Sequence, residues 1–553
     1  MKAGPGPAGF QRETSAWSPL RSRAFAILWG ATLIGNIGVW VREVGSGWLM
    51  SELAPSPLMV SLVQAAATLP VFLFSLPAGA LSDLFDRRTL LILSQIVLMA
   101  LALLMAVLTA RGAMTPALLV LCTLAAGTGA AISNPAWQSI VPELVPRPDF
   151  RNAVALNSLG INIARAVGPA LGGLLILGFG IAAAFLVDAL SYVFVVAAIL
   201  WWRSPAPRAT LPPEHLLPAM FAALRYTRGS AALRRGLLRA FLFFAFASAP
   251  WALLPLVARE VLGGSAGFYG AMLGGIGAGA VAGALLFPRL RARLGTNRLV
   301  LAATFMFSAA ALGLSGTATK WVALGLMPPL GLAWLAVLTT LNVTAQSTLP
   351  DWVRGRGLAL YTTVFFGSMA FGSLVWGQLA QLTSIEVSLA VAASAGAGVA
   401  LWLARLPLPE GDEDLSPSLH WPEPAATGAM GVDAGPVMVL VEYRVNGSDA
   451  PAFASSVAAL GTTRRRDGAY AWGVFQDSEL PERFVEYFIV ESWLEHMRQH
   501  QRVSHADERL QAAVRRLHAG PQPPCVSHLV APGWLGSGAV PPHGDQPLIE
   551  GDR

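Results

Sequence analysis

The sequence predicts an all-α polytopic membrane protein with two six-helix halves and about 12 transmembrane helices, followed by a small α+β domain. Of the 553 residues, 54% are hydrophobic and only 13% are charged. Long apolar runs follow one another as far as residue 404, and the composition changes abruptly after Arg405. Because soluble domains carry about 25% charged residues, most of this chain lacks the charge of a water-facing surface.

Each expected span is a run of about 20 mainly apolar residues, the length needed to cross a bilayer as a helix. The runs are continuously apolar rather than alternating, which favours helices over the strands of a barrel. The expected spans are 25–47, 58–82, 89–110, 115–141, 153–178, 180–202, 238–258, 266–288, 298–316, 321–345, 357–382 and 385–404.

The spans and the composition together define the expected domains. Residues 1–19 lack the short apolar core and cleavage site of a secretory signal, so the first span should remain in the protein. Residues 407–434 are rich in Pro, Gly and acidic residues, which is typical of a linker. The expected parts are an N-terminal arm (1–22), an N-terminal six-helix half (23–202), a central loop (203–237), a C-terminal six-helix half (238–406), a linker (407–435), a soluble domain (436–532) and a disordered tail (533–553).

Basic residues are concentrated in alternate loops, and the net charge is +6. Because cytoplasmic loops of membrane proteins carry an excess of Lys and Arg, this pattern predicts that both termini are cytoplasmic. It also explains the positive charge without a nucleic-acid partner, and none is expected. Within the central loop, residues 217–224 are expected to form an amphipathic helix at the membrane surface.

The two halves resemble each other in sequence, which indicates a duplication. Gln138-Ser139-Ile140-Val141-Pro142-Glu143 closes the fourth expected span, and Gln346-Ser347-Thr348-Leu349-Pro350-Asp351 closes the tenth. Duplicated halves are a hallmark of secondary transporters, whose binding site lies between the repeats near the bilayer midplane.

The loop after the second expected span carries the most specific motif, Gly79-Ala80-Leu81-Ser82-Asp83-Leu84-Phe85-Asp86-Arg87-Arg88. It resembles the loop signature of the major facilitator superfamily, Gly-x-x-x-Asp-x-x-Gly-Arg-Arg/Lys, with Asp86 in place of the second glycine. With the helix count, the basic loops and the duplicated halves, the resemblance extends over about residues 20–405. It implies the fold of that superfamily, alternating access, and the inner (plasma) membrane of a bacterium.

By this resemblance Gly79, Asp83, Asp86, Arg87 and Arg88 form a gating motif. Asp83 would face the start of the eleventh span near Gly357, where a helix dipole favours an anion by about 0.3–1 kcal/mol, or up to about 2 kcal/mol when partly buried. For Arg88, a purely topological role in the basic loop is an equally good explanation. The position of Asp83 is taken by Phe287 in the second half, so the gate is expected to be asymmetric.

The fifth expected span contains Gly168-Pro169-Ala170-Leu171-Gly172-Gly173. This segment resembles the Gly-Pro-x-x-Gly-Gly motif of antiporters in the superfamily, which are exporters. Gly168 and Gly172 also provide a small-x-x-x-small face for close helix packing, and Pro169 is expected to kink the helix. Helix packing alone is the alternative explanation for the motif.

Charged residues inside the spans are candidates for the substrate or proton pathway, because a charge at the bilayer centre costs about 2.5–3.5 kcal/mol or more without a partner or a cavity. Arg165 lies about halfway along the fifth span, where Asp188 of the sixth or an anionic substrate is a candidate partner. Arg42 and Glu43 lie near the outer end of the first span, where snorkelling is expected to satisfy them. Asp188 or Glu43 is the candidate carrier of a coupling proton. Further candidates for the cavity are Asn36, Trp40, Asn134, Trp137, Gln138, Asn162, Trp334, Asn342 and Gln346.

The soluble domain is expected to contain two helices and four strands. The order is a strand at 437–445, a helix at 450–460, strands at 469–476 and 483–492, a helix at 503–517 and a strand at 525–530. This β-α-β-β-α-β order is the ferredoxin-like pattern. Together with Glu491, Trp493 and His500 it resembles the antibiotic-biosynthesis monooxygenase type of dimeric ferredoxin-like barrel. The resemblance implies dimerisation through this domain, but it does not make the chain an enzyme.

No metal site and no cofactor are expected. Cys122 and Cys525 offer neither a disulfide framework nor a zinc spacing. His496 and His500 have helical spacing and His505 follows them, but no Cys or acidic ligand set accompanies the three. They are therefore expected to be solvated surface histidines.

The expected function is export of a small molecule, a siderophore or an amphiphilic drug, by proton antiport. This follows from a resemblance to the enterobactin-exporter-like branch of the superfamily, which shares the Ser-Asp-x-x-Asp-Arg-Arg loop and the Pro-Glu-Leu-Val element at 142–145. The small molecule, protons and the lipid bilayer are the expected partners. Two alternatives stay open, a membrane-anchored enzyme acting through the soluble domain, and a module in that domain that senses ligand and regulates the pore.

Overall fold

The computed structural model describes residues 15, 17–84, 86–202, 216–408, 413–418, 420–421 and 434–531, which fall into two compact units. The first unit is formed by described residues of Met1–Pro212, Leu237–Asn342 and Ala359–Leu408. The second is formed by those of Pro213–Gly236, Val343–Leu358 and Pro409–Arg553.

Eleven helices among the described residues are long and apolar enough to cross a membrane. One of them, α9 (Ala266–Ser315), has 50 residues and leaves helical geometry at Gly295, where φ is 70° and ψ is 168°. Glycine adopts such a conformation without the steric cost that a Cβ would bring. Helix α9 therefore contains two of the predicted spans, 266–288 and 298–316, and the prediction of an all-α polytopic membrane protein is confirmed.

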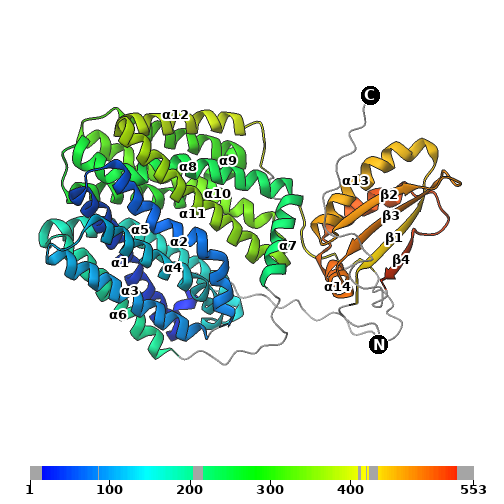
Figure 1. Ribbon diagram of the computed structural model, residues 1–553, viewed down its shortest axis with the longest axis horizontal. Helices are drawn as coiled ribbons and strands as arrows, with labels where there is room; N and C mark the ends of the chain where they lie inside the picture. The colour runs from blue at the N-terminus through cyan, green and yellow to red at the C-terminus, as the bar shows by residue number, and fades with distance from the viewer. Residues whose placement is uncertain are drawn as a thin grey trace. The chain divides into compact units, whose positions relative to one another are not determined.

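The first six helices form one group, coloured blue to green in Figure 1. Within it α1 packs against α5 and α6, α2 packs against α4, and α3 packs against α4 and α6. Side chains of Ser22, Asp86 and Thr115 cap the beginnings of α1, α3 and α4, each accepting a hydrogen bond from the backbone N–H three residues on. The bounds are α1 (Arg23–Leu53), α2 (Pro57–Leu84), α3 (Arg87–Ala110), α4 (Pro116–Leu144), α5 (Phe150–Phe179) and α6 (Ile181–Trp201).

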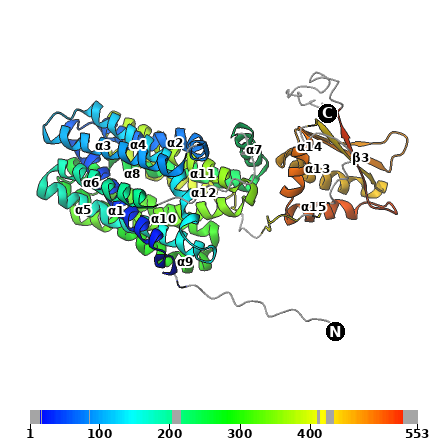
Figure 2. The ribbon, with the colours of Figure 1, turned by 90° about the horizontal axis from the view of Figure 1, so that it is seen from below.

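The second group of long helices, green to yellow in Figures 1 and 2, contains a cluster of aromatic rings. The buried Trp334 ring lies 5.2 Å from the centroids of both Phe244 and Trp251, and Phe244 lies 4.5 Å from Phe365. Edge-to-face contacts of this kind add to the stability gained by burying the rings. The bounds are α8 (Ala231–Leu256), continued by a π-turn (Val257–Val261), α9, α10 (Lys320–Ser347), α11 (Asp351–Leu382) and α12 (Ile385–Leu403).

Helices α5 and α9 connect the two groups. At their contact the two backbones touch directly, with no side chain between them. A Cβ built on Gly173 would lie 2.8 Å from the Cα of Gly270 and 3.0 Å from the carbonyl oxygen of Ala266. A Cβ on Gly277 would likewise lie 2.5 Å from the Cα of Ala166. Small residues let membrane helices approach this closely, and the contact then depends on van der Waals packing.

The second unit contains a four-stranded antiparallel sheet in the order β2-β3-β1-β4. Val439 of β1 lies opposite Phe488 of β3 on one side and His528 of β4 on the other. The predicted β-α-β-β-α-β order is therefore found, and the small α+β domain is confirmed. The bounds are β1 (Val437–Arg444), α13 (Ala450–Arg466), β2 (Ala471–Gln476), β3 (Arg483–Val490), α14 (Trp493–Arg502), α15 (His505–Arg516) and β4 (Cys525–Val530).

The helix predicted at 503–517 is found as α15, but the helix α14 that precedes it was not predicted. Val503 between them is extended, with φ −62° and ψ 122°. Ser504 begins α15 with a capping box, in which its hydroxyl and the Asp507 carboxylate each bond the other residue's backbone N–H. No element was predicted between the strand that was expected to end at 492 and the helix that was expected to begin at 503, so α14 was missed.

Two segments outside the sheet belong to the second unit and contact its domain. Helix α7 (Leu216–Gly229), from the central loop, packs against α13, and the Arg466 guanidinium lies 5.3 Å from the centre of the Tyr226 ring. Residues 413–418 and 420–421, within the predicted linker, also contact the domain. The Ser418 backbone N–H donates to the Val503 carbonyl at 2.9 Å, and Trp421 Nε1 donates to Gln511 Oε1 at 2.8 Å.

The α5–α9 contact makes Gly173 a sensitive position. Replacement of Gly173 by Ala should lower the stability of the protein by about 1–3 kcal/mol, because the new methyl group meets backbone atoms that cannot move aside alone. The melting temperature of the detergent-solubilised protein measures this effect.

The matched control is Gly178→Ala in the same helix, where a Cβ meets nothing within 4 Å. Equal melting temperatures for the two variants would show that the backbones of α5 and α9 do not touch as described.

Candidate substrate and ion pathway

A cavity of about 340 Å³ lies among α1, α3, α4, α5 and α6, and we call it the N-half cavity. Asn36, Asn134 and Gln138, predicted from their polar side chains within spans, line it together with Trp137. Gln95, Asn157 and Tyr192 line it as well and were missed. Asn36 was predicted because it is a polar amide within a span. The same criterion could have predicted Gln95 and Asn157.

A buried ion pair joins α1 to α6. Arg42 Nε lies 3.0 Å from Asp188 Oδ2, and Arg42 Nη2 lies 3.3 Å from Glu43 Oε1. Arg42 is 6% exposed and Asp188 is 0% exposed. The expectation that Arg42 snorkels at the end of its span was wrong, since its charge is satisfied by a carboxylate inside the helix group.

The ion pair adjoins the N-half cavity through α6. Tyr192, one helical turn after Asp188, lines the cavity. A Cβ on Gly38 would lie 3.0 Å from Asp188 Oδ1 and 2.3 Å from Ser191 Oγ, so Gly38 allows α1 and α6 to approach at this point. The cavity and the ion pair therefore belong to one polar region of the first unit.

Arg165 does not pair with Asp188, whose partner is Arg42. The Arg165 guanidinium instead lies 5.8 Å from the centre of the Trp40 ring, a cation–π contact between α5 and α1. Two predicted candidates thus contact each other, although neither lines the N-half cavity. Asn162, on the same helix, donates to the Ser158 carbonyl at 2.9 Å.

The antiporter-like motif lies where α5 contacts both α1 and α9. A Cβ built on Gly168 would lie 2.5 Å from Trp40 Cβ, and a Cβ built on Gly172 would lie 3.2 Å from Val41 Cα. On the opposite contact, Pro169 and Gly173 lie against Gly270. The motif therefore packs α5 against two helices at once. On α1, Arg42 directly follows Val41, which contacts Gly172.

In the gating motif the described side chains stabilise the ends of helices. Asp86 accepts hydrogen bonds from the Thr89 hydroxyl at 2.7 Å and the Thr89 backbone N–H at 2.8 Å, and these lower the pKa of Asp86 below its usual value. Arg87 Nη1 pairs with Glu143 Oε1 at 3.0 Å. Arg88 donates to the carbonyls of Ile199 and Leu200 at the end of α6, where a cation is favoured.

The side chain of Asp83 and its expected contact with the eleventh span lie outside what the structure describes, and the same holds for the surroundings of Gly79. The backbone of both belongs to the last turns of α2. Their gating roles stay predictions.

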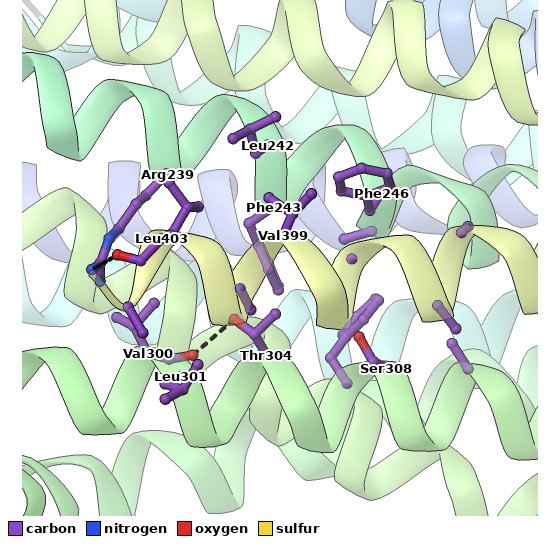
Figure 3. Close-up of a pocket in the computed structure, with 18 of the residues that line it drawn as sticks. Arg239, Leu242, Phe243, Phe246, Val300, Leu301, Thr304, Ser308, Val399 and Leu403 are labelled. Carbon is purple, nitrogen blue, oxygen red and sulfur yellow. Dashed lines mark hydrogen bonds between the residues drawn. The ribbon is translucent and has the colours of Figure 1, made fainter. Parts of the chain in front are cut away.

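The second group of helices has a different cavity. It has a volume of about 200 Å³, lies between α8, α9 and α12, and is lined mainly by apolar side chains such as Phe243 and Phe246 (Figure 3). At one end Arg239 Nη2 donates to the carbonyls of Leu403 and Leu406 at 2.7 and 2.8 Å, so its charge is used to cap α12. The predicted residues Trp334, Asn342 and Gln346 lie on α10 and do not line this cavity.

The sheet domain brings three histidines together. His496 and His500 of α14 and His528 of β4 have ring nitrogens within 4.8 Å of one another. Burial, and then the neighbouring His500, lowers the pKa of His496 to about 3, and burial lowers that of His500 to about 4. His496 is only 1% exposed, so the expectation of a solvated surface histidine was wrong for it. His505 lies apart and pairs with Glu508 at 2.9 Å.

A family model described as "Transmembrane secretion effector" matches residues 14–533, nearly the whole chain. The chain belongs to this family of major facilitator transporters. The predicted superfamily is thereby confirmed, and the match continues past the last long helix through the sheet domain.

Three curated relatives of this chain are transporters. The staphyloferrin A transporter of Staphylococcus aureus (strain NCTC 8325 / PS 47) is 23% identical over 63% of this chain and 87% of its own length. The multidrug efflux pump Tap of Mycobacterium tuberculosis (strain ATCC 25618 / H37Rv) is 24% identical over 66% and 89%. The enterobactin exporter EntS of Citrobacter koseri is 26% identical over 66% and 88%.

Solved structures agree on the fold. A bacterial homologue of the human lysosomal transporter Spinster, inward-facing and occupied, matches with a TM-score of 0.57 at 14% identity, over 70% of this chain and 97% of its own. The nucleoside transporter NupG matches with a TM-score of 0.53 at 12% identity, over 69% and 98%. The chain therefore has the major facilitator fold. Its family and the eleven long apolar helices among its described residues make it a multi-pass membrane transporter.

The buried ion pair yields a stability prediction. Replacing Arg42 by Met should lower the unfolding free energy by about 3–5 kcal/mol, because it leaves the Asp188 carboxylate buried without its partner. The double variant Arg42→Met, Asp188→Leu should regain most of this loss. Melting temperatures in detergent compare the two.

Arg165→Met is the control, because it removes an arginine that the structure places against Trp40 rather than against a carboxylate. The pairing is refuted if the double variant melts as low as Arg42→Met alone.

Proposed function

We propose that the chain is a secondary active exporter of a small molecule, a siderophore or an amphiphilic drug, and that it works by proton antiport and alternating access. The observation that carries this proposal is the buried Arg42–Asp188 pair beside the polar N-half cavity. An ionisable pair inside a membrane bundle is costly to bury, and such pairs mark substrate or ion pathways.

The cavity suits a ligand with polar and aromatic parts. It offers the amides of Asn36, Asn134 and Gln138 and the rings of Trp137 and Tyr192. Amide groups can donate to and accept from a ligand's hydroxyls and carbonyls, while the indole and phenol rings provide apolar contact. The names of the relatives, a staphyloferrin A transporter, an enterobactin exporter and a multidrug efflux pump, support the same classes of substrate.

In the proposed cycle Asp188 carries the proton. As a carboxylate it is held by Arg42; once protonated, it would release Arg42 and weaken the contact between α1 and α6 next to the cavity. A protonated Asp188 and a bound substrate would then favour different arrangements of the same helices, which is the requirement for coupled exchange. Glu43, in contact with Arg42, would hold the arginine's charge while Asp188 is neutral.

Alternating access is supported by contacts at one end of the bundle. The Trp48 ring of α1 stacks on Tyr269 of α9 at 6.1 Å, and the Arg259 guanidinium donates to the Ser51 carbonyl. If the basic loops face the cytoplasm, both termini are cytoplasmic and these contacts close the outer end. The antiporter-like motif lies on α5 beside the same two helices, a position from which its packing would influence opening.

Transport by inverted membrane vesicles tests the proposal. A proton gradient should drive accumulation of members of a siderophore and drug panel by the wild-type protein. Asp188→Asn, which resembles a permanently protonated carboxyl, should abolish this accumulation while gradient-independent exchange of the same substrate persists. Glu386→Gln, at the beginning of α12, is the control and should transport as the wild type does.

Two results would contradict the proposal. One is a wild-type protein that accumulates no member of the panel. The other is proton-driven accumulation that survives Asp188→Asn, since Asp188 could not then carry the proton.

The gating motif yields a separate expectation. Asp83→Asn should reduce accumulation, because it removes the anion proposed to favour a closed cytoplasmic side. Asp86→Asn should have little effect, because Asn caps a helix about as well as Asp does. Equal transport rates for both variants in the vesicle assay would remove Asp83 from the gate.

A further inference from the structure

We propose that His496, His500 and His528 form a binding site for a divalent transition metal of the Zn²⁺ class in the C-terminal sheet domain. The site lies outside the transport pathway proposed above and does not depend on it. It consists of two histidines one helical turn apart on α14 and a third from β4, the edge strand next to β1.

The distance between the first two nitrogens suits a shared metal ion. Zinc binds imidazole nitrogens at about 2.0–2.1 Å in tetrahedral geometry, which places two bound nitrogens about 3.3–3.4 Å apart. His500 Nε2 and His496 Nε2 are 3.3 Å apart. His528 brings the third nitrogen within 4.8 Å of the others, and the proposal requires this separation to shorten to about 3.3–3.4 Å when the metal binds.

The surroundings prepare His496 to act as a ligand. Its Nδ1 lies 3.5 Å from Gln499 Oε1, an acceptor. With the proton on Nδ1 donated to that oxygen, the lone pair of Nε2 points to the other histidines. A hydrogen bond from the second ring nitrogen is the usual means of orienting a metal-bound histidine.

Aromatic rings surround the three imidazoles. The ring centroid of Trp421 lies 4.8 Å from that of His500, and the ring centroid of Trp493 lies 5.6 Å from that of His496 and 5.9 Å from that of His528. The nearby Arg464 is paired with the buried Glu486 at 3.2 Å, which offsets part of its positive charge. Apolar rings around a metal site restrict the access of solvent and lower the local dielectric constant.

A hydrogen bond between two neutral imidazoles is the competing explanation for the 3.3 Å distance. It accounts for His496 and His500, but it does not require the third histidine. Among the residues that the structure describes, the cluster contains three imidazoles and neither a carboxylate nor a thiolate, which matches the preference of Zn²⁺, Cu²⁺ and Ni²⁺ rather than that of Mg²⁺ or Ca²⁺. Three protein ligands also leave a fourth position for water or another small ligand.

The test uses the full-length protein in detergent, purified without a histidine tag and stripped of metal with a chelator. Co²⁺, which reports its geometry by visible absorption, and Zn²⁺, in competition with a chromogenic chelator, are the probes. We expect one equivalent per chain, a tetrahedral Co²⁺ spectrum, and displacement of Co²⁺ by Zn²⁺.

Three variants assign the ligands. Loss of the hydrogen-bond partner of a metal ligand lowers affinity about 10–100-fold, so loss of a ligand should cost at least about 100-fold. His500→Gln and His528→Gln should therefore lose the site, whereas His505→Gln, which lies apart and pairs with Glu508, should bind as the wild type does. Far-ultraviolet circular dichroism and tryptophan fluorescence establish that each variant is folded.

The wild-type titration decides the proposal even if a variant fails to fold. Absence of stoichiometric binding, or an octahedral Co²⁺ spectrum, overturns it. Binding that persists in folded His500→Gln and His528→Gln, or that falls equally in His505→Gln, overturns it as well.

Discussion

The first group of helices is organised around a charge that has to be neutralised away from water. Arg42 and Asp188 lie on helices far apart in sequence, and each is buried. A lone charge at such a place is costly, so α1 and α6 must keep the register that brings the two together. The same register places Gly38 against Asp188 and Ser191, and it places Asn36 and Tyr192 on the wall of the cavity.

Close packing supplies the second constraint. The glycines of α5 leave no room for side chains against α1 or α9, so three helices meet almost backbone to backbone. Interfaces of this kind are satisfied in a few discrete arrangements and resist continuous deformation. A bundle with such a crossing next to an ion pair is suited to switch between states, and in the cycle that we propose the charge of Asp188 selects among them.

Much of the fold could be predicted because it depends on one-dimensional signals. The lengths of the spans and the order of strands and helices in the sheet domain are visible in the sequence, and apart from α14 the elements were found where these signals predict them. The partners of charged side chains were harder to predict, because pairing depends on how each helix is rotated about its own axis. Arg165 was proposed as the partner of Asp188 because both residues lie within membrane spans. The structure instead places Arg42 on the side of α1 that faces Asp188. The histidine cluster was missed for a related reason, since His528 joins α14 only through the antiparallel pairing of β4 with β1.

The connection inside α9 differs from an ordinary loop between spans. From Pro288 onward the chain stays helical up to Gly295, turns there, and continues directly into the next long segment. Each residue of a helix advances the direction of the chain by about 100°, so one inserted residue before Gly295 would re-aim everything that follows it. Loops commonly tolerate insertions. In this connection, by contrast, an inserted residue would rotate the second helical segment of α9 relative to the first. Its length, more than the identity of its exposed side chains, is thus what relatives sharing this geometry have to preserve.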